Sequence, residues 1–274
     1  MRDGHIWKIE KMEMMGIINV TPDSFYAGSR VSGAEEALKT ADRMIAEGAK
    51  ILDIGGESTR PGSDPVSEEQ EIERVVPVIR KIREHYPDIV LSVDTYRSGT
   101  AEASLKAGCD IINDISALTF DSRMADVAAE YAAPVILMHI KGTPDHMQDD
   151  PHYDDVVREV HEFLERQISY AISKGITDDR IVIDLGIGFG KNDTHNLSLL
   201  RHIRAFDDLG MPHLLAVSRK SFIGRTLGEK DPADRLYGTT AVTAYAAANG
   251  IELARVHDVK PNLDAARIIE AVMG

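Results

Sequence analysis

Short runs of apolar residues recur along the chain, separated by longer segments in which apolar residues return every three or four positions. The short runs are nearly continuous rather than alternating, which is typical of parallel strands buried on both faces. We therefore predict strands over residues 13–20, 51–54, 89–94, 110–115, 133–139, 180–185, 213–218 and 251–257. The longer segments predict helices over residues 33–47, 67–85, 98–107, 121–131, 153–174, 194–206, 232–249 and 262–272.

Strands and helices alternate eight times over 274 residues, or about 34 residues per unit. An open, doubly wound sheet would also alternate in this way. Eight units with no linker, compositional break or internal repeat favour an α/β fold closed into one (β/α)8 TIM barrel, which typically needs about 250 residues. We expect a single domain over residues 1–274, with a short N-terminal extension of residues 1–12 covering the bottom of the barrel.

The composition is that of an ordinary globular protein, with 43% apolar and 28% charged residues. Because 31 basic residues face 45 acidic ones, the net charge is −14, which disfavours nucleic acid and anionic membranes as partners. An anionic substrate would then need a local cluster of positive charge. The single cysteine, Cys109, cannot form an internal disulfide, and no segment has the apolar length of a signal peptide or a membrane span. We expect a cytoplasmic protein in which Cys109 is a buried apolar residue.

Every predicted strand ends in polar residues, and in a TIM barrel the catalytic groups lie at the carboxyl ends of the strands. A single Asp or Asn at such a place could simply cap the next helix. Capping does not explain the whole set, nor the charged Asp184 and Arg255 inside strand-like runs. The candidates are Asn19, Asp53, Glu57, Asp94, Asn113, Asp114, His139, Asp184, Ser218, Arg219, Lys220, Arg255 and His257.

Positive charge gathers after the last two predicted strands. The segment Ser218-Arg-Lys-Ser221 supplies two cations, and Arg255 and His257 alternate, so they share one face of a strand. Phosphate groups commonly bind at this place in TIM barrels. The carboxylates of Asp94 and Asp184 would instead accept hydrogen bonds from N–H groups. Together these residues suit a ligand with a donor-rich heterocycle at one end and an anion at the other.

Two glycine-containing loops follow predicted strands. The loop Asp53-Ile-Gly-Gly-Glu-Ser-Thr-Arg-Pro-Gly62 pairs two glycines with donors suited to a diphosphate or a carboxylate. In Asp184-Leu-Gly-Ile-Gly-Phe-Gly-Lys191 the glycines are spaced G-x-G-x-G rather than G-x-G-x-x-G, and no Lys-Ser pair follows. This spacing does not support a nucleotide cofactor.

The motifs of zinc enzymes and serine hydrolases do not occur in the sequence. We interpret His139 as a strand-end residue rather than a metal ligand. A hard cation remains, namely Mg²⁺ held by one protein oxygen, such as that of Asn19, with substrate phosphates supplying the other ligands.

Eight segments in this order, each at the end of a predicted strand, resemble the signatures of the dihydropteroate synthase family. They are Met15-Gly-Ile-Ile-Asn-Val-Thr-Pro-Asp-Ser-Phe25, Asp53-Ile-Gly-Gly-Glu-Ser-Thr-Arg-Pro-Gly62, Ser92-Val-Asp-Thr95, Ile112-Asn-Asp-Ile115, Met138-His139, Asp184-Leu-Gly-Ile-Gly-Phe-Gly190, Ser218-Arg-Lys-Ser221 and Arg255-Val-His-Asp258. The resemblance spans nearly the whole chain.

The resemblance implies a dimeric, Mg²⁺-dependent transferase of folate biosynthesis, a class of enzyme targeted by sulfonamides. Such an enzyme condenses hydroxymethyl-dihydropterin diphosphate with p-aminobenzoate, releasing pyrophosphate. Its pterin would be hydrogen-bonded and lined by Asp94, Asn113, Ile115, Met138, Asp184, Phe189, Lys220 and Arg255. The diphosphate would be held by Asn19 (through Mg²⁺), Arg255 and His257, and the aminobenzoate by Thr59, Arg60, Pro61, Phe189 and Ser221. Asp94, Lys220, Arg255 and His257 would be the catalytic residues.

The chain departs from the family pattern at two places. The family usually continues Ser-Phe-Ser-Asp-Gly-Gly where this chain has Tyr26 and Ala27 after Phe25, which removes a carboxylate from the first loop. It also often has Pro where Leu185 stands. Two alternatives stay open. One is a methyltetrahydrofolate methyltransferase that acts with a corrinoid protein, which also binds a pterin in such a barrel, and the other, because Tyr26 and Ala27 alter the first loop, is a pterin-binding paralogue that has lost turnover.

Overall fold

The computed structural model describes residues 9–20, 30–58 and 66–274. Its strands are β1 Glu13–Asn19, β2 Ile51–Gly55, β3 Val90–Asp94, β4 Ile111–Asp114, β5 Val135–Met138, β6 Ile181–Asp184, β7 His213–Leu215 and β8 Leu253–Val256. Its α-helices are α1 Arg30–Ala46, α2 Glu68–His85, α3 Ser98–Lys106, α4 Met124–Glu130, α5 Val156–Ser173, α6 Asp193–Arg201, α7 Ser221–Leu227, α8 Leu236–Ala248 and α9 Val259–Met273.

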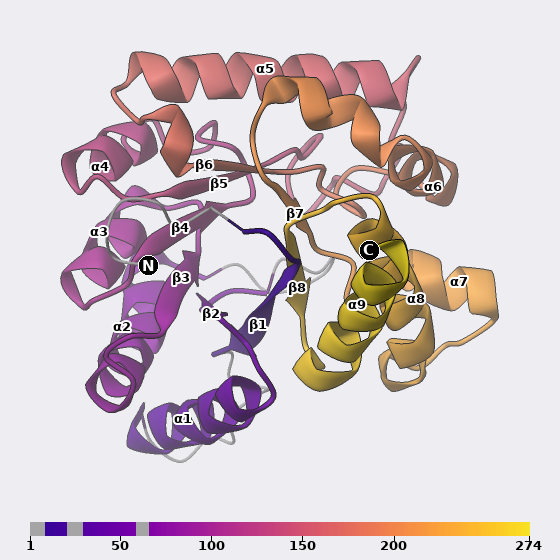
Figure 1. The fold of residues 1–274 in the computed structure, drawn as a ribbon. Coiled ribbons are helices and arrows are strands. Elements are labelled where there is room, and N and C mark those ends of the chain that lie inside the picture. The colour runs from indigo at the N-terminus through magenta and orange to yellow at the C-terminus, as the bar shows by residue number, and fades with distance from the viewer. Residues whose placement is uncertain (1–8, 21–29, 59–65) are drawn as a thin grey trace.

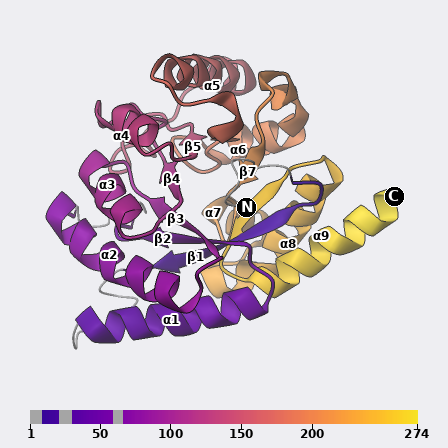
Figure 2. The same ribbon diagram turned by 60° about the vertical axis from the view of Figure 1, so that its left-hand side comes forward.

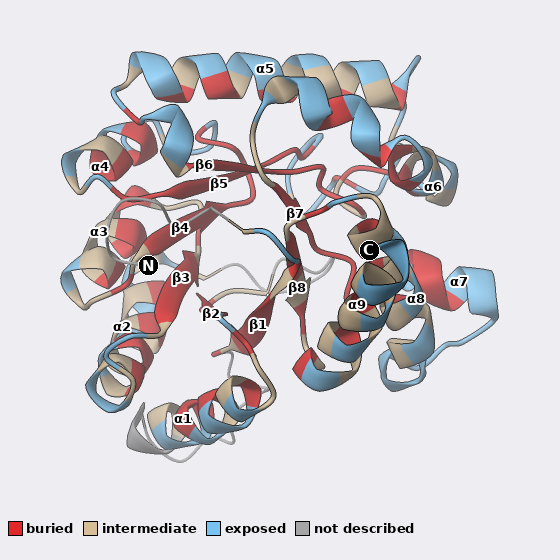
Figure 3. Ribbon diagram, viewed as in Figure 1, coloured by how far each residue is buried: buried red, intermediate tan, exposed pale blue. Residues whose placement is uncertain are grey.

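The eight strands form a closed parallel barrel in chain order. Each strand pairs with the next, and β8 pairs with β1 so that Arg255 lies opposite Met15. The helices surround the barrel on the outside (Figures 1 and 2). Figure 3 shows strands that are buried nearly throughout and helices that are buried on the side facing them, so the prediction of a (β/α)8 TIM barrel is confirmed.

Strand alternation divides the side chains into two sets. One set faces the helices and belongs to the large core between sheet and helices, as Met14, Ile18 and Leu52 do. The other set faces the barrel axis, and its lowest layer is a purely apolar cluster with one residue from each strand: Met15, Ile51, Val90, Ile111, Ile136, Val182, Leu214 and Leu253. This layer closes the bottom of the barrel, so any cavity must lie above it.

Two residues further along each strand, the inward positions become largely polar. These positions are Ile17, Asp53, Ser92, Asn113, Met138, Asp184, Ala216 and Arg255. Because side chains in a strand point the same way at every second residue, the polar residues of this layer share the barrel interior with the apolar layer beneath it. The apolar layer therefore forms the floor under a polar site.

Several predicted boundaries are wrong. The strand predicted over residues 213–218 ends at Leu215, and the short helix α7 that follows was not predicted. The helix predicted from residue 153 begins at Val156, because the Asp155 side chain caps it by accepting from the backbone N–H groups of Val157 and Arg158. The helix predicted over residues 232–249 begins as a 3-10 turn before α8.

Three smaller expectations concerned the N-terminal extension, Cys109 and membrane-spanning segments. Of the N-terminal extension, residues 9–12 are described, and Ile9 packs against the apolar floor. The thiol of Cys109 is buried, as expected. Among the described residues, no helix is both long and apolar enough to cross a membrane.

Candidate active site

A cavity of about 520 Å³ opens at the carboxyl ends of the strands. All the described residues to which the family resemblance gave a role line it, whereas the strand-end candidates Asp53, Asp114 and His139 do not. The residues with such a role are Asn19, Asp94, Asn113, Ile115, Met138, Asp184, Phe189, Lys220, Ser221, Arg255 and His257. Thr59, Arg60 and Pro61, predicted to hold the aminobenzoate, lie outside the described residues, as do Tyr26 and Ala27. The cavity therefore joins residues from the ends of all eight strands or the loops that follow them.

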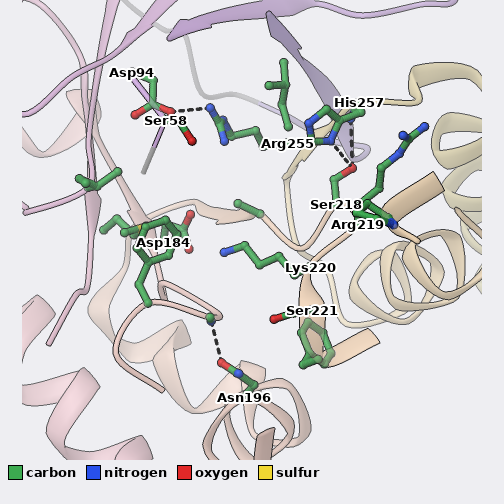
Figure 4. A pocket seen from close by; sticks show the side chains of 18 of the residues that line it. Ser58, Asp94, Asp184, Asn196, Ser218, Arg219, Lys220, Ser221, Arg255 and His257 are labelled. Atoms are coloured by element: carbon green, nitrogen blue, oxygen red, sulfur yellow. Dashed lines mark hydrogen bonds and ion pairs between the residues drawn. The ribbon is translucent and has the colours of Figure 1, made fainter. Parts of the chain in front are cut away.

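The centre of the cavity is an arginine between two aspartates. Nε of Arg255 donates to Oδ2 of Asp53 at 2.5 Å, and Nη2 donates to Oδ2 of Asp94 at 2.6 Å. The side chain of Asp53 is fully buried, while those of Asp94 and Arg255 are 17% exposed. Asn113 also donates to Asp53, at 3.1 Å. Residues from β2, β3, β4 and β8 are thereby joined in one network, of which Figure 4 shows the pair formed by Arg255 and Asp94.

Burial raises the pKa of Asp94 to about 7, because a carboxylate removed from water is poorly solvated. The Arg255 guanidinium opposes this rise, and the nearby carboxylate of Asp53 adds to it. The carboxyl of Asp94 is thus poised to change charge near neutral pH, at a place where a ligand would meet it.

On another wall, Asp184 faces Lys220. Figure 4 shows the Lys220 side chain extending towards Asp184. Burial lowers the pKa of Lys220 to about 8, and attraction to Asp184 limits the decrease. Burial likewise raises the pKa of Asp184, with Lys220 opposing it. Oδ1 of Asp184 accepts from the backbone N–H of Gly186 at 2.7 Å, which fixes the carboxylate at the end of β6.

Apolar side chains form the remaining part of this wall. Ile115, Met138 and Met147 cluster together, and the ring of Phe189 packs against them. Nζ of Lys220 lies 4.5 Å from the centroid of the same ring. A flat heterocycle could therefore pack on apolar surface while its edge meets Asp94, Asn113, Asp184 and Lys220.

Two of the basic side chains expected to bind an anion, Arg219 and His257, already have partners within the protein. Arg219, which has a left-handed backbone (φ 57°), is bound by Asp258 through two hydrogen bonds of 2.9 and 2.8 Å. Oγ of Ser218 accepts from the backbone N–H of His257 at 3.1 Å and lies 2.9 Å from Nδ1 of the same residue. If the Ser218 hydroxyl donates to Nδ1, the ring proton of neutral His257 resides on Nε2.

Arg97 binds two of the described residues that flank residues 59–65, Glu57 and Val66. Its guanidinium donates to Oε2 of Glu57 at 2.7 Å and to the backbone oxygen of Val66 at 2.6 Å. It also donates at 3.0 Å to buried Glu71, whose pKa is raised by burial. Nothing in the spacing of Arg97 identified it beforehand, because its partners are 26 to 40 residues away, in the loop after β2 and in α2.

The sequence did not predict the roles of two further residues, Asp53 and Lys191. Asp53 was noted only as one of the polar strand ends, and its importance comes from pairing with Arg255, which is 202 residues away. Lys191 was read only as part of a loop, yet it lines the cavity and is 1% exposed. Asp114, another strand-end candidate, faces away from the axis and caps the turn at Ser116 and Leu118.

Leu185, where the family often has Pro, is buried in the core between sheet and helices and does not line the cavity. This departure therefore does not change a group that could contact a ligand.

Comparison with known proteins identifies the class. The profile of the pterin binding enzymes matches residues 15–257 of this chain. The dihydropteroate synthase of Synechocystis is 42% identical over 259 residues, which cover 94% of this chain and 89% of that protein.

Solved structures of dihydropteroate synthases are similar to this chain in both fold and sequence. The dihydropteroate synthase of Clostridium difficile, crystallised with pteroic acid, superposes with a TM-score of 0.91 at 41% identity, covering 97% of this chain and 99% of that one. That of Xanthomonas albilineans with 4-aminobenzoic acid gives 0.90 at 43% identity, covering 97% and 94%.

The barrel and its cavity are thus those of a pterin-binding enzyme. Within that class, the chain belongs to the dihydropteroate synthase family. None of these relatives bears the name of a corrinoid methyltransferase, the first alternative considered from the sequence.

Arg255→Met should lower the free energy of unfolding by about 3–5 kcal/mol, because it leaves two buried carboxylates without their cation. Urea denaturation at pH 8 measures this. Arg225→Met is the matched control: Arg225 pairs with Asp193 at 2.5 Å, but the two side chains are 56% and 36% exposed. The control should change stability by less than about 1 kcal/mol. Equal effects of the two substitutions would contradict the assignment.

Proposed function

We propose that this chain condenses 6-hydroxymethyl-7,8-dihydropterin diphosphate with p-aminobenzoate to give 7,8-dihydropteroate and pyrophosphate. The observation that carries the proposal is a single cavity lined by carboxylates, by an apolar wall, and by Arg255 and His257. Relatives crystallised with pteroic acid and with 4-aminobenzoic acid support the same substrates.

The pterin edge presents N–H donors and acceptors, which suit Asp94, Asn113, Asp184 and Lys220. Ile115, Met138 and Phe189 would line its faces, and the guanidinium of Arg255 would stack on the ring. Since two nitrogens of that guanidinium already bind Asp53 and Asp94, Arg255 is held in place before the ligand arrives. The aminobenzoate would lie at the outer end, near Phe189 and Ser221 and next to the segment that carries Thr59, Arg60 and Pro61.

The diphosphate would lie near Asn19, Arg255 and His257. Among residues 9–20, 30–58 and 66–274, no group of three or more His, Cys, Asp and Glu could hold a metal ion. Asn19, at the end of β1, offers a neutral oxygen to the cavity, which fits Mg²⁺ bound mainly through substrate phosphates. The ion would supply neutralisation of the pyrophosphate charge.

An aniline is a weak nucleophile, so we infer that the C–O bond to pyrophosphate breaks before the C–N bond forms. Arg255 and His257 stabilise the departing anion, and the carboxylate of Asp94 stabilises the positive charge on the pterin methylene. The nitrogen of p-aminobenzoate then attacks that carbon and loses a proton. No bond to the protein forms, so a pterin adduct trapped on the chain would overturn this step.

The direct test combines the pterin diphosphate, Mg²⁺ and the purified protein with and without p-aminobenzoate. Pyrophosphate release coupled to dihydropteroate, detected by chromatography, is the expected result. Pterin binding without product would instead identify a paralogue that has lost turnover, the second alternative left open by Tyr26 and Ala27.

Asp184→Asn should weaken pterin binding by about 1–3 kcal/mol, because an amide oxygen replaces a charged acceptor of pterin N–H groups. The asparagine oxygen can still accept from Gly186, so the loop should keep its anchor. Calorimetric titration with a pterin measures the effect, and Asp126→Asn, in a surface pair with Lys174 away from the cavity, serves as control. Unchanged pterin affinity in Asp184→Asn would remove Asp184 from the pterin site.

Pterin affinity should be highest between about pH 7 and pH 8. Below about 7 Asp94 gains a proton and loses acceptor capacity, and above about 8 Lys220 loses the proton that it would donate. On both the acid and the basic side, the pterin affinity should decrease by up to about tenfold per pH unit. In Asp94→Asn the decrease on the acid side should disappear while the decrease on the basic side remains. If the decrease in affinity on the acid side persists in Asp94→Asn, a group other than Asp94 is responsible for it.

The remaining proposals concern the whole molecule. We infer that residues 1–274 act as one catalytic domain and that the enzyme works in the cytoplasm, consistent with a lone buried cysteine. We also infer a homodimer: Leu227 and Tyr237, near the ends of α7 and α8, are 52% and 84% exposed, as large apolar residues at an interface would be. Neither nucleic acid nor membrane is expected to bind.

A further inference from the structure

The loop between β6 and α6 is held by side chains from elsewhere in the chain as well as by contacts of its own. Gln148 donates to the backbone oxygen of Gly188 at 2.6 Å, and the Tyr153 hydroxyl donates to that of Gly190 at 2.9 Å. Lys220 donates to the backbone oxygen of Ile187. This loop carries Phe189 into the cavity, so its shape decides where the Phe189 ring lies.

Two of its glycines are required by close backbone contacts. At Gly186 (φ 64°) a Cβ would lie 1.8 Å from the backbone oxygen of His139, and at Gly190 (φ 61°) one would lie 2.3 Å from that of Lys141. The loop therefore packs directly on the backbone that follows β5, where no other residue type fits.

The side-chain nitrogen of Lys191 lies between these two segments. Its Nζ is 2.9 Å from the backbone oxygen of Gly186, 3.0 Å from that of Phe189 and 2.8 Å from Nδ1 of His139. The backbone oxygen of His139 lies 3.3 Å from the same Nζ, so the side chain of Lys191 joins the loop to the end of β5 through several hydrogen bonds. His139 accepts as a neutral ring, since burial and Lys191 both lower its pKa.

Burying the polar side-chain nitrogen of Lys191 costs free energy of desolvation, which other interactions must offset. Lys191 is 1% exposed, and its Nζ makes no ion pair with a carboxylate of the described residues. Burial lowers its pKa well below the ordinary value, and repulsion by Lys220 adds to this. A methionine of similar length would fill the same space without a buried polar group, so what Lys191 provides beyond packing is the set of hydrogen bonds to the loop.

We propose that Lys191 is a positioning residue of the dihydropteroate synthase reaction: it holds the 186–190 loop so that the Phe189 ring forms the wall shared by the pterin and the p-aminobenzoate. The proposal rests on the proposed function for its kinetic consequence. Its structural part, that Lys191 fixes the loop, does not.

The kinetic test is a double-mutant cycle. Lys191→Met should raise KM for p-aminobenzoate about tenfold in the wild-type background and less than twofold in Phe189→Ala, because Lys191 acts through that ring. Lys174→Met is the matched control: Lys174 pairs with Asp126 on the surface, and its substitution should leave KM unchanged. Thermal melts establish that each variant is folded at the assay temperature.

Two kinetic outcomes would overturn the proposal. One is a lower melting temperature with unchanged KM and kcat, which would make Lys191 a stabilising residue only. The other is the same KM increase in both backgrounds, which would show that Lys191 does not act through Phe189. If Lys191→Met fails to fold, Tyr153→Phe decides: loss of its hydrogen bond to Gly190 should raise KM two- to threefold, again only when Phe189 is present, and an unchanged KM would overturn the proposal.

Hydrogen exchange separates this proposal from the proposed function, because it needs no substrate. Amides of residues 186–190 should exchange at least tenfold faster in Lys191→Met than in the wild type, while those of the control Lys174→Met should not. A wild-type protein that makes no dihydropteroate would refute the proposed function alone. Unchanged exchange in Lys191→Met would refute the role of Lys191 alone.

Discussion

The site depends on one buried cation placed between two carboxylates. Arg255 on β8 reaches Asp53 on β2 and Asp94 on β3, across the point where β1 closes the barrel. Without the arginine, two carboxylates would stand close together in a barrel with an apolar floor, which is unfavourable in an environment of low polarity. With it, Asp94 and Asn113 are held at the edge of the cavity, where hydrogen-bonding groups of a ligand can reach them.

Strand alternation explains why these groups meet. The apolar floor takes one residue from each strand, and the polar layer takes the residue two positions later. The register of the sheet then sets the level of each side chain along the barrel axis. Asp94 pairs with Asn113 between β3 and β4, and Met138 pairs with Asp184 between β5 and β6. The pterin end of the proposed site follows from these two pairings, because they place acceptors and apolar surface at one level of the barrel.

The sequence was sufficient for the barrel and for most of the cavity lining, because both depend on local periodicity and on polar residues at strand ends. It was insufficient where the partner is remote. Asp53 matters through Arg255, and Lys191 matters through the backbone of a loop and a histidine 52 residues earlier. Arg219 looked like part of an anion site, but its charge is bound by Asp258, which belongs to the loop after β8.

The most direct test of this account asks whether uncompensated charge, rather than lost packing, makes Arg255 indispensable. The measurement is the free energy of unfolding of Arg255→Met compared with that of the triple variant Arg255→Met, Asp53→Asn, Asp94→Asn, in urea at pH 8. If the arginine serves to neutralise the two carboxylates, the triple variant should regain roughly half or more of the stability that the single substitution loses. A triple variant no more stable than Arg255→Met would contradict the account.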